Sequence, residues 1–151
     1  MTKQATYDAD FYLWTRQQAA LLRQGRLQAV DATHLAEEIE SMGRSEAREA
    51  VSRMTVLLAH LLKWQHQPER GEPEISGRNW RRTLTEQRRS LAKLFRDSPS
   101  LRARLPELIV DAYPDAAEFA RLETGLIDPP WSADECPYSP GEVMADDFLP
   151  Q

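Results

Sequence analysis

The sequence predicts an all-α protein: a compact bundle of five or six helices with an extended C-terminal tail that aromatic side chains anchor. Two observations carry this prediction. Apolar residues recur at intervals of three and four through most of residues 10–124, which is the period of an amphipathic helix. No convincing segment alternates apolar and polar residues as a half-buried strand does. A chain of 151 residues with 41% hydrophobic and 28% charged residues also matches one globular domain, so we expect residues 1–151 to form a single helical domain.

Three helices are expected in the first half of the chain. They cover residues 10–25, 31–43 and 45–65, each of which carries apolar residues at helical spacing. Gly25 and Gly43 are expected to end the first two, because glycine commonly follows the last turn of a helix. The third segment has the widest apolar arc and is therefore expected to lie at the centre of the bundle.

A loop and a fourth helix come next. The stretch from Pro68 to Gly77 contains two prolines and two glycines, which together break regular structure. Residues 78–97 then return to helical periodicity, with their large apolar side chains on one face. We therefore predict a mid-chain loop at residues 68–77 and a helix at residues 78–97.

Prolines organise the next part of the chain. Ser98 followed by Pro99 is typical of a helix start, since the first helical residue does not use its amide hydrogen within the helix. Proline inside a helix breaks or kinks it. Pro106 and Pro114 are therefore expected to divide residues 99–124 into short or kinked helices.

The composition changes after Gly125 to an acidic, proline-rich tail over residues 126–151. This tail contains Trp131, Tyr138 and Phe148, and aromatic side chains each bury roughly 150–250 Å². We expect these side chains to pack back onto the bundle. Docking of the tail on another protein is the alternative.

The sequence also indicates a compartment. The first ten residues contain Asp8 and Asp10 and no apolar run, so no secretory signal is expected. The longest apolar cluster, residues 56–62, is too short to span a membrane, so no membrane association is expected. Cys136 is the single cysteine and cannot form an internal disulfide. We therefore expect a cytoplasmic protein.

Several short motifs follow one another along nearly the whole chain. In order, they are Leu35-Ala-Glu-Glu-Ile-Glu-Ser-Met-Gly43, His60-Leu-Leu-Lys-Trp64, Gln67-Pro68, Ser98-Pro-Ser-Leu101, Glu123-Thr-Gly-Leu126, Cys136-Pro-Tyr138 and Asp147-Phe-Leu-Pro150. Together these motifs resemble a bacterial family known as domain of unknown function 29. The resemblance covers nearly the whole chain. It implies an all-helical fold, and it implies no activity or catalytic residues.

The charge is distributed unevenly along the chain. Residues 78–104 hold nine Lys or Arg against two acidic residues, a net of +7, whereas residues 105–151 have a net of −10. On a helical wheel, five basic residues lie opposite the apolar stripe and form a basic band: Arg78, Arg82, Arg89, Lys93 and Arg96. Such a band could contact nucleic-acid phosphates. Solvation of the band, or its coverage by the acidic tail, is the favoured alternative, and the net charge of −5 also argues against a dedicated nucleic-acid binder.

A second candidate site is a metal site. If residues 31–43 and 45–65 formed an antiparallel helix pair, His34, Glu38 and His60 could approach one metal ion, and this donor set suits zinc, iron or manganese. The paired Glu-x-x-His motifs of a di-iron bundle are absent, which favours purely structural roles for these residues.

A third candidate is the motif Cys136-Pro-Tyr-Ser139, which superficially resembles a redox-active thiol motif. Redox motifs of this kind normally place the cysteine at a helix N-terminus, which lowers the pKa of the thiol. The helix start is expected after Cys136, so a structural turn is the preferred interpretation.

No sequence feature identifies an enzyme. The chain has no glycine-rich phosphate loop and no nucleophile elbow. The leading hypothesis is therefore a non-catalytic protein-interaction or regulatory module with no cofactor and an unidentified protein partner. A nucleic-acid-associated factor that uses the basic band is the alternative, and a metal-dependent enzyme is the third hypothesis.

Overall fold

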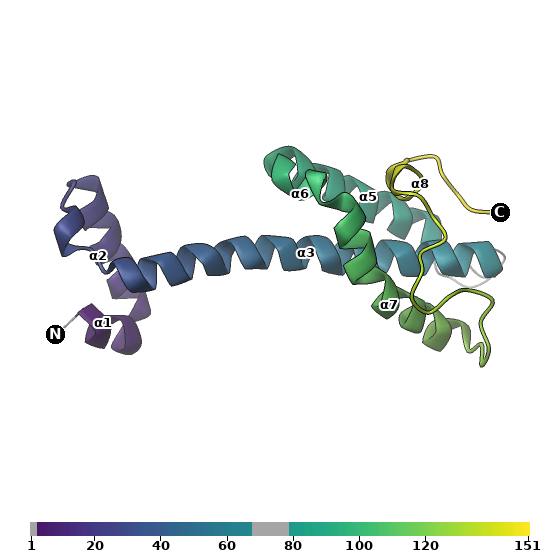
Figure 1. The fold of residues 1–151 in the computed structure, drawn as a ribbon, viewed down its shortest axis with the longest axis horizontal. Helices are drawn as coiled ribbons and strands as arrows, with labels where there is room; N and C mark the ends of the chain where they lie inside the picture. The colour runs from purple at the N-terminus through teal and green to yellow at the C-terminus, as the bar shows by residue number, and fades with distance from the viewer. Residues whose placement is uncertain (1–2, 68–78) are drawn as a thin grey trace. The chain divides into compact units, whose positions relative to one another are not determined.

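A computed structural model describes residues 3–67 and 79–151 of the protein (Figure 1). All regular secondary structure in these residues is helical, which confirms the all-α prediction. In chain order the elements are α1 (Lys3–Ala9), α2 (Phe11–Arg23), the 3₁₀ turn η1 (Leu27–Ala29), α3 (Ala32–His66), α5 (Trp80–Asp97), α6 (Pro99–Ala103), α7 (Leu105–Thr124) and α8 (Pro140–Met144). Helix α1 was not predicted. The loop predicted at residues 68–77 lies outside the described residues, as does Arg78.

The prediction of separate helices over residues 31–43 and 45–65 was wrong, because α3 runs without a break from Ala32 to His66. Gly43 lies inside α3 and does not have a positive φ. Glycine inside a helix is about 1 kcal/mol less favourable than alanine, a cost that a long helix can tolerate. Gly25 does follow the last turn of α2 as predicted, with a φ of +69° that favours glycine.

Proline positions within the second half were predicted only in part. Pro99 begins α6 and Pro106 lies in the first turn of α7, where a proline needs no amide hydrogen. Pro114, however, lies inside α7 and does not divide it. The helix continues to Thr124 because both of its ends pack into the same core, which includes Leu108 and Ala120.

The chain divides into two compact units, residues 1–46 and residues 47–151, which we call unit 1 and unit 2. Unit 1 contains α1, α2, η1 and the first turns of α3. Asp10 begins α2 by accepting a hydrogen bond from the Leu13 amide at 2.9 Å. Among the residues of unit 1 whose burial is described, Thr6, Trp14, Gln18 and Asp31 are buried, so three of these four side chains are polar.

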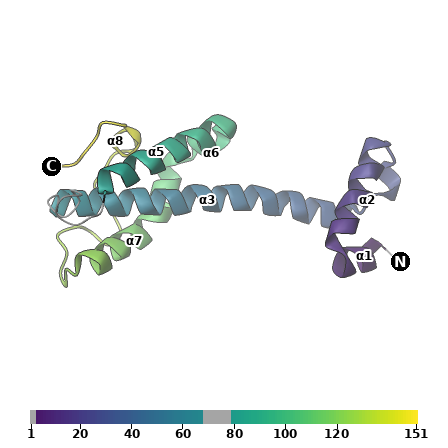
Figure 2. The same ribbon diagram turned by 180° about the vertical axis from the view of Figure 1, so that it is seen from behind.

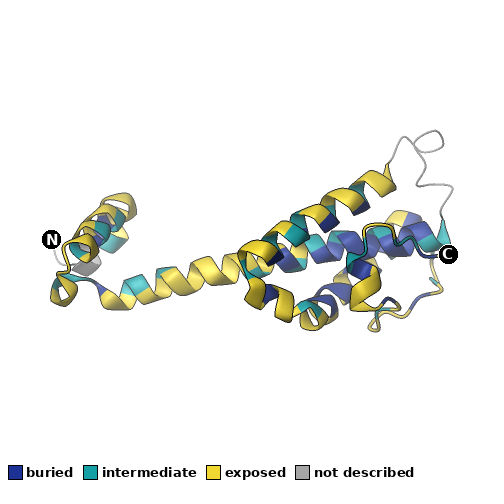
Figure 3. Ribbon diagram, turned by 90° about the horizontal axis from the view of Figure 1, so that it is seen from above, coloured by how far each residue is buried: buried dark blue, intermediate teal, exposed yellow. Residues whose placement is uncertain are grey.

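Unit 2 is a helical bundle around one apolar core. The buried residues of α3 lie in its C-terminal half, from Ala50 to Trp64, and α5 and α7 pack against that half (Figures 1, 2 and 3). The central position expected for residues 45–65 is therefore confirmed within unit 2. Its core also contains Trp131, Tyr138 and Val143 from the tail.

The tail is held by aromatic side chains, as predicted. The Trp131 indole donates to the Ala117 carbonyl at 3.3 Å, and the Tyr138 hydroxyl donates to Gln65 Oε1 at 2.8 Å. Phe148 packs against this core, with its ring edge-on to Tyr138 at 6.0 Å between centroids. These contacts bury apolar surface and also satisfy the polar atoms of the rings.

Candidate functional sites

The basic band lies on α5. Asn79 caps this helix, since its Oδ1 accepts from the Arg82 amide at 2.8 Å. The described members of the band are all exposed: Arg82, Arg89, Lys93 and Arg96. Their spacing of seven, four and three residues places them on one side of the helix. Arg82 Nε donates to Glu86 Oε1 at 2.8 Å, so the band includes one acidic side chain.

Another basic residue of α5, Arg88, is buried and does not belong to the band. Its side chain is only 2% exposed, and its guanidinium donates to the carbonyls of Val143 at 2.9 Å and Glu142 at 3.3 Å. Burial lowers the pKa of Arg88, and the carboxylates of Asp146 and Asp147 oppose that shift. The acidic tail therefore contacts α5 at Arg88, and the four described members of the basic band remain exposed.

A polar cluster in unit 1 surrounds Asp31, at the start of α3. Its Oδ2 accepts from the Trp14 indole at 3.2 Å and lies 2.7 Å from His34 Nδ1. Its backbone amide donates to Gln18 Oε1 at 2.7 Å. Burial alone would raise the pKa of Asp31, but the hydrogen bonds from His34 and Trp14 outweigh it and lower the pKa. The hydrogen bond to Asp31 raises the pKa of His34.

Tyr7 extends this cluster to the next turn of α3. Its ring stacks on the His34 ring at 3.9 Å between centroids, and its hydroxyl donates to Glu38 Oε1 at 2.5 Å. This hydrogen bond to Glu38 is the largest cause that raises the pKa of Tyr7, to about 12. Each of these polar side chains is therefore used to join α1, α2 and α3.

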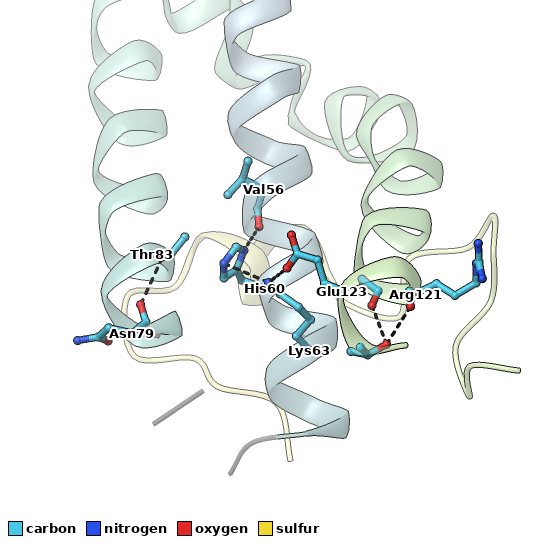
Figure 4. Close-up of polar contacts among 9 residues, drawn as sticks. Val56, His60, Lys63, Asn79, Thr83, Arg121 and Glu123 are labelled. Carbon is cyan, nitrogen blue, oxygen red and sulfur yellow. Dashed lines mark hydrogen bonds and ion pairs between the residues drawn. The ribbon is translucent and has the colours of Figure 1, made fainter. Parts of the chain in front are cut away.

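A second polar cluster lies in unit 2, between α3 and α7 (Figure 4). Lys63 is only 2% exposed, and its ammonium pairs with the Glu123 carboxylate, whose side chain is 50% exposed. The ammonium also lies 3.3 Å from His60 Nε2 and 4.9 Å from the centre of the Trp80 ring. These three contacts stabilise the charged form of a lysine that has been removed from water.

The geometry also assigns the protonation of His60. Its Nδ1 lies 2.8 Å from the Val56 carbonyl, so Nδ1 carries the hydrogen and Nε2 accepts from Lys63. Burial and the nearby Lys63 charge lower the pKa of His60. His60 is therefore a neutral hydrogen-bond relay between the α3 backbone and Lys63.

A pocket of about 400 Å³ opens beside this cluster. It is lined by His60, Lys63, Asn79, Trp80, Thr83 and Glu123. Within this lining, the Lys63 ammonium is paired with the Glu123 carboxylate. The cluster acts as a structural link between α3, α5 and α7.

The metal-site hypothesis depended on an antiparallel helix pair that the structure does not contain. His34 and Glu38 lie near the start of α3 in unit 1, and His60 lies near its end in unit 2. Within residues 3–67 and 79–151, no group of three or more His, Cys, Asp or Glu residues could hold a metal ion. The premise of this hypothesis is therefore wrong.

Cys136 lies in irregular backbone just before a bend at residues 137–138. It is partly buried and donates to the Tyr138 carbonyl at 3.6 Å, and burial raises its pKa. Ser139, not Cys136, caps the following helix. A raised pKa reduces the thiolate that redox chemistry requires, which favours the structural interpretation.

Sequence reasoning did not identify the Lys63–Glu123 pair. One signal was present in the sequence, because Lys63 interrupts the apolar run of Leu61, Leu62 and Trp64. A lysine at such a position is rarely buried without a partner. The partner itself lies 60 residues further along the chain, and no local pattern points to Glu123.

Unit 1 exposes most of its large apolar side chains. Seven of them are between 39% and 70% exposed: Phe11, Tyr12, Leu13, Leu22, Leu27, Ile39 and Met42. We call this set the apolar surface of unit 1. Trp14 is the only large apolar side chain that is buried among the described residues of this unit.

These observations define a class: an all-helical protein with a small, polar-centred helical unit and a larger bundle closed by its own tail. Among the described residues, no helix is both long enough and apolar enough to cross a membrane. A family model described as domain of unknown function DUF29 matches residues 6–149, and the chain belongs to this family. No curated protein and no solved structure matches the chain.

Proposed function

We propose that the protein is a non-catalytic protein-interaction or regulatory module of the bacterial cytoplasm, and that its contact surface is the apolar surface of unit 1. The observation that carries this proposal is the contrast between seven exposed large apolar side chains and one buried one in the described part of unit 1. The proposal requires no cofactor. The single cysteine supports a reducing compartment.

The physical argument concerns where unit 1 obtains its stability. Removing apolar surface from water contributes about 25 cal/mol per Å², and small units bury little of it by themselves. Polar contacts around Asp31 fill the centre of unit 1, so its apolar area stays at the surface. Exposed apolar side chains that adjoin one another commonly mark protein-binding sites.

Ile39 and Met42 offer the clearest point of attachment. They are 65% and 70% exposed and lie three residues apart on α3, so their side chains are neighbours on one face. Glu37, Glu40 and Arg44 are exposed on the same segment and would surround an apolar contact with charge. An apolar centre with a polar rim is the usual arrangement of a protein interface.

The test is a tagged pull-down from the native host, performed at low and high salt and with or without nuclease. The double variant Ile39→Asp/Met42→Asp should lose a partner that the parent protein retains at high salt and after nuclease treatment. The matched control is Val110→Asp/Leu122→Asp, which changes two exposed apolar residues of unit 2, at 68% and 59% exposure. Equal retention by both double variants would refute the assignment of the surface.

A nucleic-acid-associated role remains the second candidate, because the described members of the basic band are exposed and aligned on α5. Contacts to phosphates release counterions, so such binding would weaken steeply with salt. Charge reversal, Arg82→Glu/Arg89→Glu, should abolish this binding and leave an apolar protein contact intact. Absence of binding to both duplex and single-stranded nucleic acid at low salt would remove this candidate.

A further inference from the structure

A pocket of about 380 Å³ lies in unit 2, where α5, α6, the start of α7 and α8 meet. Its apolar lining includes Phe95, Leu105 and Met144. Phe95 belongs to the buried core, and Leu105 and Met144 pack against that core while remaining partly accessible. The lining is therefore a fixed apolar surface that can receive an alkyl group.

Two arginines also line this pocket. Arg96 lies in the last turn of α5 and Arg102 in the last turn of α6, and both are exposed. In the part of the chain that the structure describes, neither guanidinium forms an ion pair or a hydrogen bond with another side chain. A guanidinium binds a carboxylate through two parallel hydrogen bonds, so the pair provides a site for an acidic group.

Helix α8 forms one wall of the pocket, and contacts within the protein hold this helix in place. Ser139 and Glu142 form a reciprocal capping box at the start of this helix, in which the Glu142 carboxylate accepts a hydrogen bond from the Ser139 amide. Val143 is fully buried, and Arg88 holds the carbonyls of Glu142 and Val143 from α5. A preformed pocket does not have to be ordered when the ligand binds, which favours affinity.

We propose that this pocket binds a small amphiphilic carboxylate, a medium-chain fatty acid, with its alkyl chain against Phe95, Leu105 and Met144 and its carboxylate between Arg96 and Arg102. The volume lies near the lower end of the roughly 300–1,000 Å³ that small-molecule sites occupy. A mostly apolar lining with a few converging polar groups is also the usual composition of such sites. The pocket belongs to unit 2 alone and does not depend on the proposed role of unit 1.

Calorimetric titration of the full chain with decanoate tests the proposal, with hexanoate and decanol as companion ligands. Decanoate should bind more tightly than hexanoate, because a longer chain buries more apolar surface. Decanol should bind at least tenfold more weakly than decanoate, because it lacks the charge that the arginines recognise. Equal affinity for decanoate and decanol, or no binding of decanoate, would overturn the proposal.

Variants locate the site. Arg96→Gln/Arg102→Gln should weaken decanoate binding at least tenfold, and both side chains are exposed, so the fold should be retained. Arg82→Gln/Arg89→Gln removes the same charge from exposed positions of α5 outside the pocket and should leave the affinity unchanged. If both double variants weaken decanoate binding equally, the affinity depends on the net charge of the protein, and the assignment of binding to this pocket is wrong.

Methyl resonances of methionine give an independent readout. Addition of decanoate should shift the signal of Met144, which lines the pocket. Met42 is 70% exposed on unit 1 and reports adsorption to the apolar surface there. A shift of Met42 without a shift of Met144 would contradict the proposed site.

Discussion

Replacing Glu123 with glutamine tests whether the Lys63–Glu123 pair holds the helices of unit 2 together. The substitution keeps the size of the side chain and removes the charge that faces the Lys63 ammonium. Lys63 is 2% exposed, so it cannot turn to water without moving the core around it. The ammonium would keep its contacts with His60 and Trp80, which are weaker than a bond to a carboxylate.

The magnitude depends on the exposure of the two partners. Breaking a fully buried ion pair costs about 3–5 kcal/mol, whereas an exposed pair is worth about 0–1 kcal/mol. The Glu123 side chain is 50% exposed and solvent screens part of its charge, so the pair lies between these limits. We expect Glu123→Gln to lower the free energy of unfolding by about 1–3 kcal/mol.

Urea denaturation followed by circular dichroism measures this change. Glu118→Gln is the matched control, because Glu118 is also on α7 and also pairs with a basic residue, Arg121, at an exposed position. It should leave stability nearly unchanged. In the double variant Lys63→Met/Glu123→Gln, the buried charge is absent, and part of the lost stability should return. If Glu123→Gln is as harmless as Glu118→Gln, the pair does not stabilise unit 2 and the argument fails.

Three further predictions concern the fold. Gly43→Ala should raise the free energy of unfolding by about 0.5–1 kcal/mol, because Gly43 is helical and a Cβ there meets open space. Gly125→Ala should lower the free energy of unfolding, because Gly125 has a φ of +71°. Thermal denaturation of both variants measures these opposite changes. Imidazole resonances in an NMR titration should place the pKa of His34 above 6.5 and that of His60 below it. The contribution of His34 to stability is therefore present below pH 6.5 and is lost as the pH rises through the pKa of His34 in the folded state. The contribution of His60 has the opposite sign: it is present above pH 6.5 and is lost as the pH falls through the pKa of His60 in the folded state. Deletion of residues 126–151 should unfold unit 2, since each buried aromatic side chain contributes about 1.5–3 kcal/mol to a total of about 5–15 kcal/mol, and a folded bundle by circular dichroism would contradict the anchoring role of the tail.

The sites were less predictable than the helices, and particular residues explain why. Arg82, Arg89, Lys93 and Arg96 were identified as one exposed face, because helical periodicity alone places them opposite the apolar stripe. Arg88 lies between them in sequence, and its burial depends on the tail carbonyls more than fifty residues away.

Local signals also predicted some helix boundaries and failed at others. Gly25 and Gly43 look alike as helix-ending signals, yet only Gly25 ends a helix. The two positions differ in the residues C-terminal to them, because those after Gly43 continue into the apolar arc that unit 2 buries. Pro114 likewise remains inside α7, whose apolar residues on both sides enter one core. Tertiary packing overrides a local signal that is worth only a few kcal/mol.

The all-helical class was determined by the sequence itself, because hydrophobic periodicity acts within a few turns of chain. Aromatic anchoring of the tail was the preferred of two sequence-based interpretations, and only the tertiary structure decided its contacts, such as the one between Tyr138 and Gln65. Tertiary structure alone decided three other features: the Lys63–Glu123 pair, the Asp31 cluster of unit 1, and the presence of Arg96 and Arg102 in the lining of one pocket. Each joins residues from different helices. Their contacts depend on how those helices pack, which short-range patterns of hydrophobicity and charge do not specify.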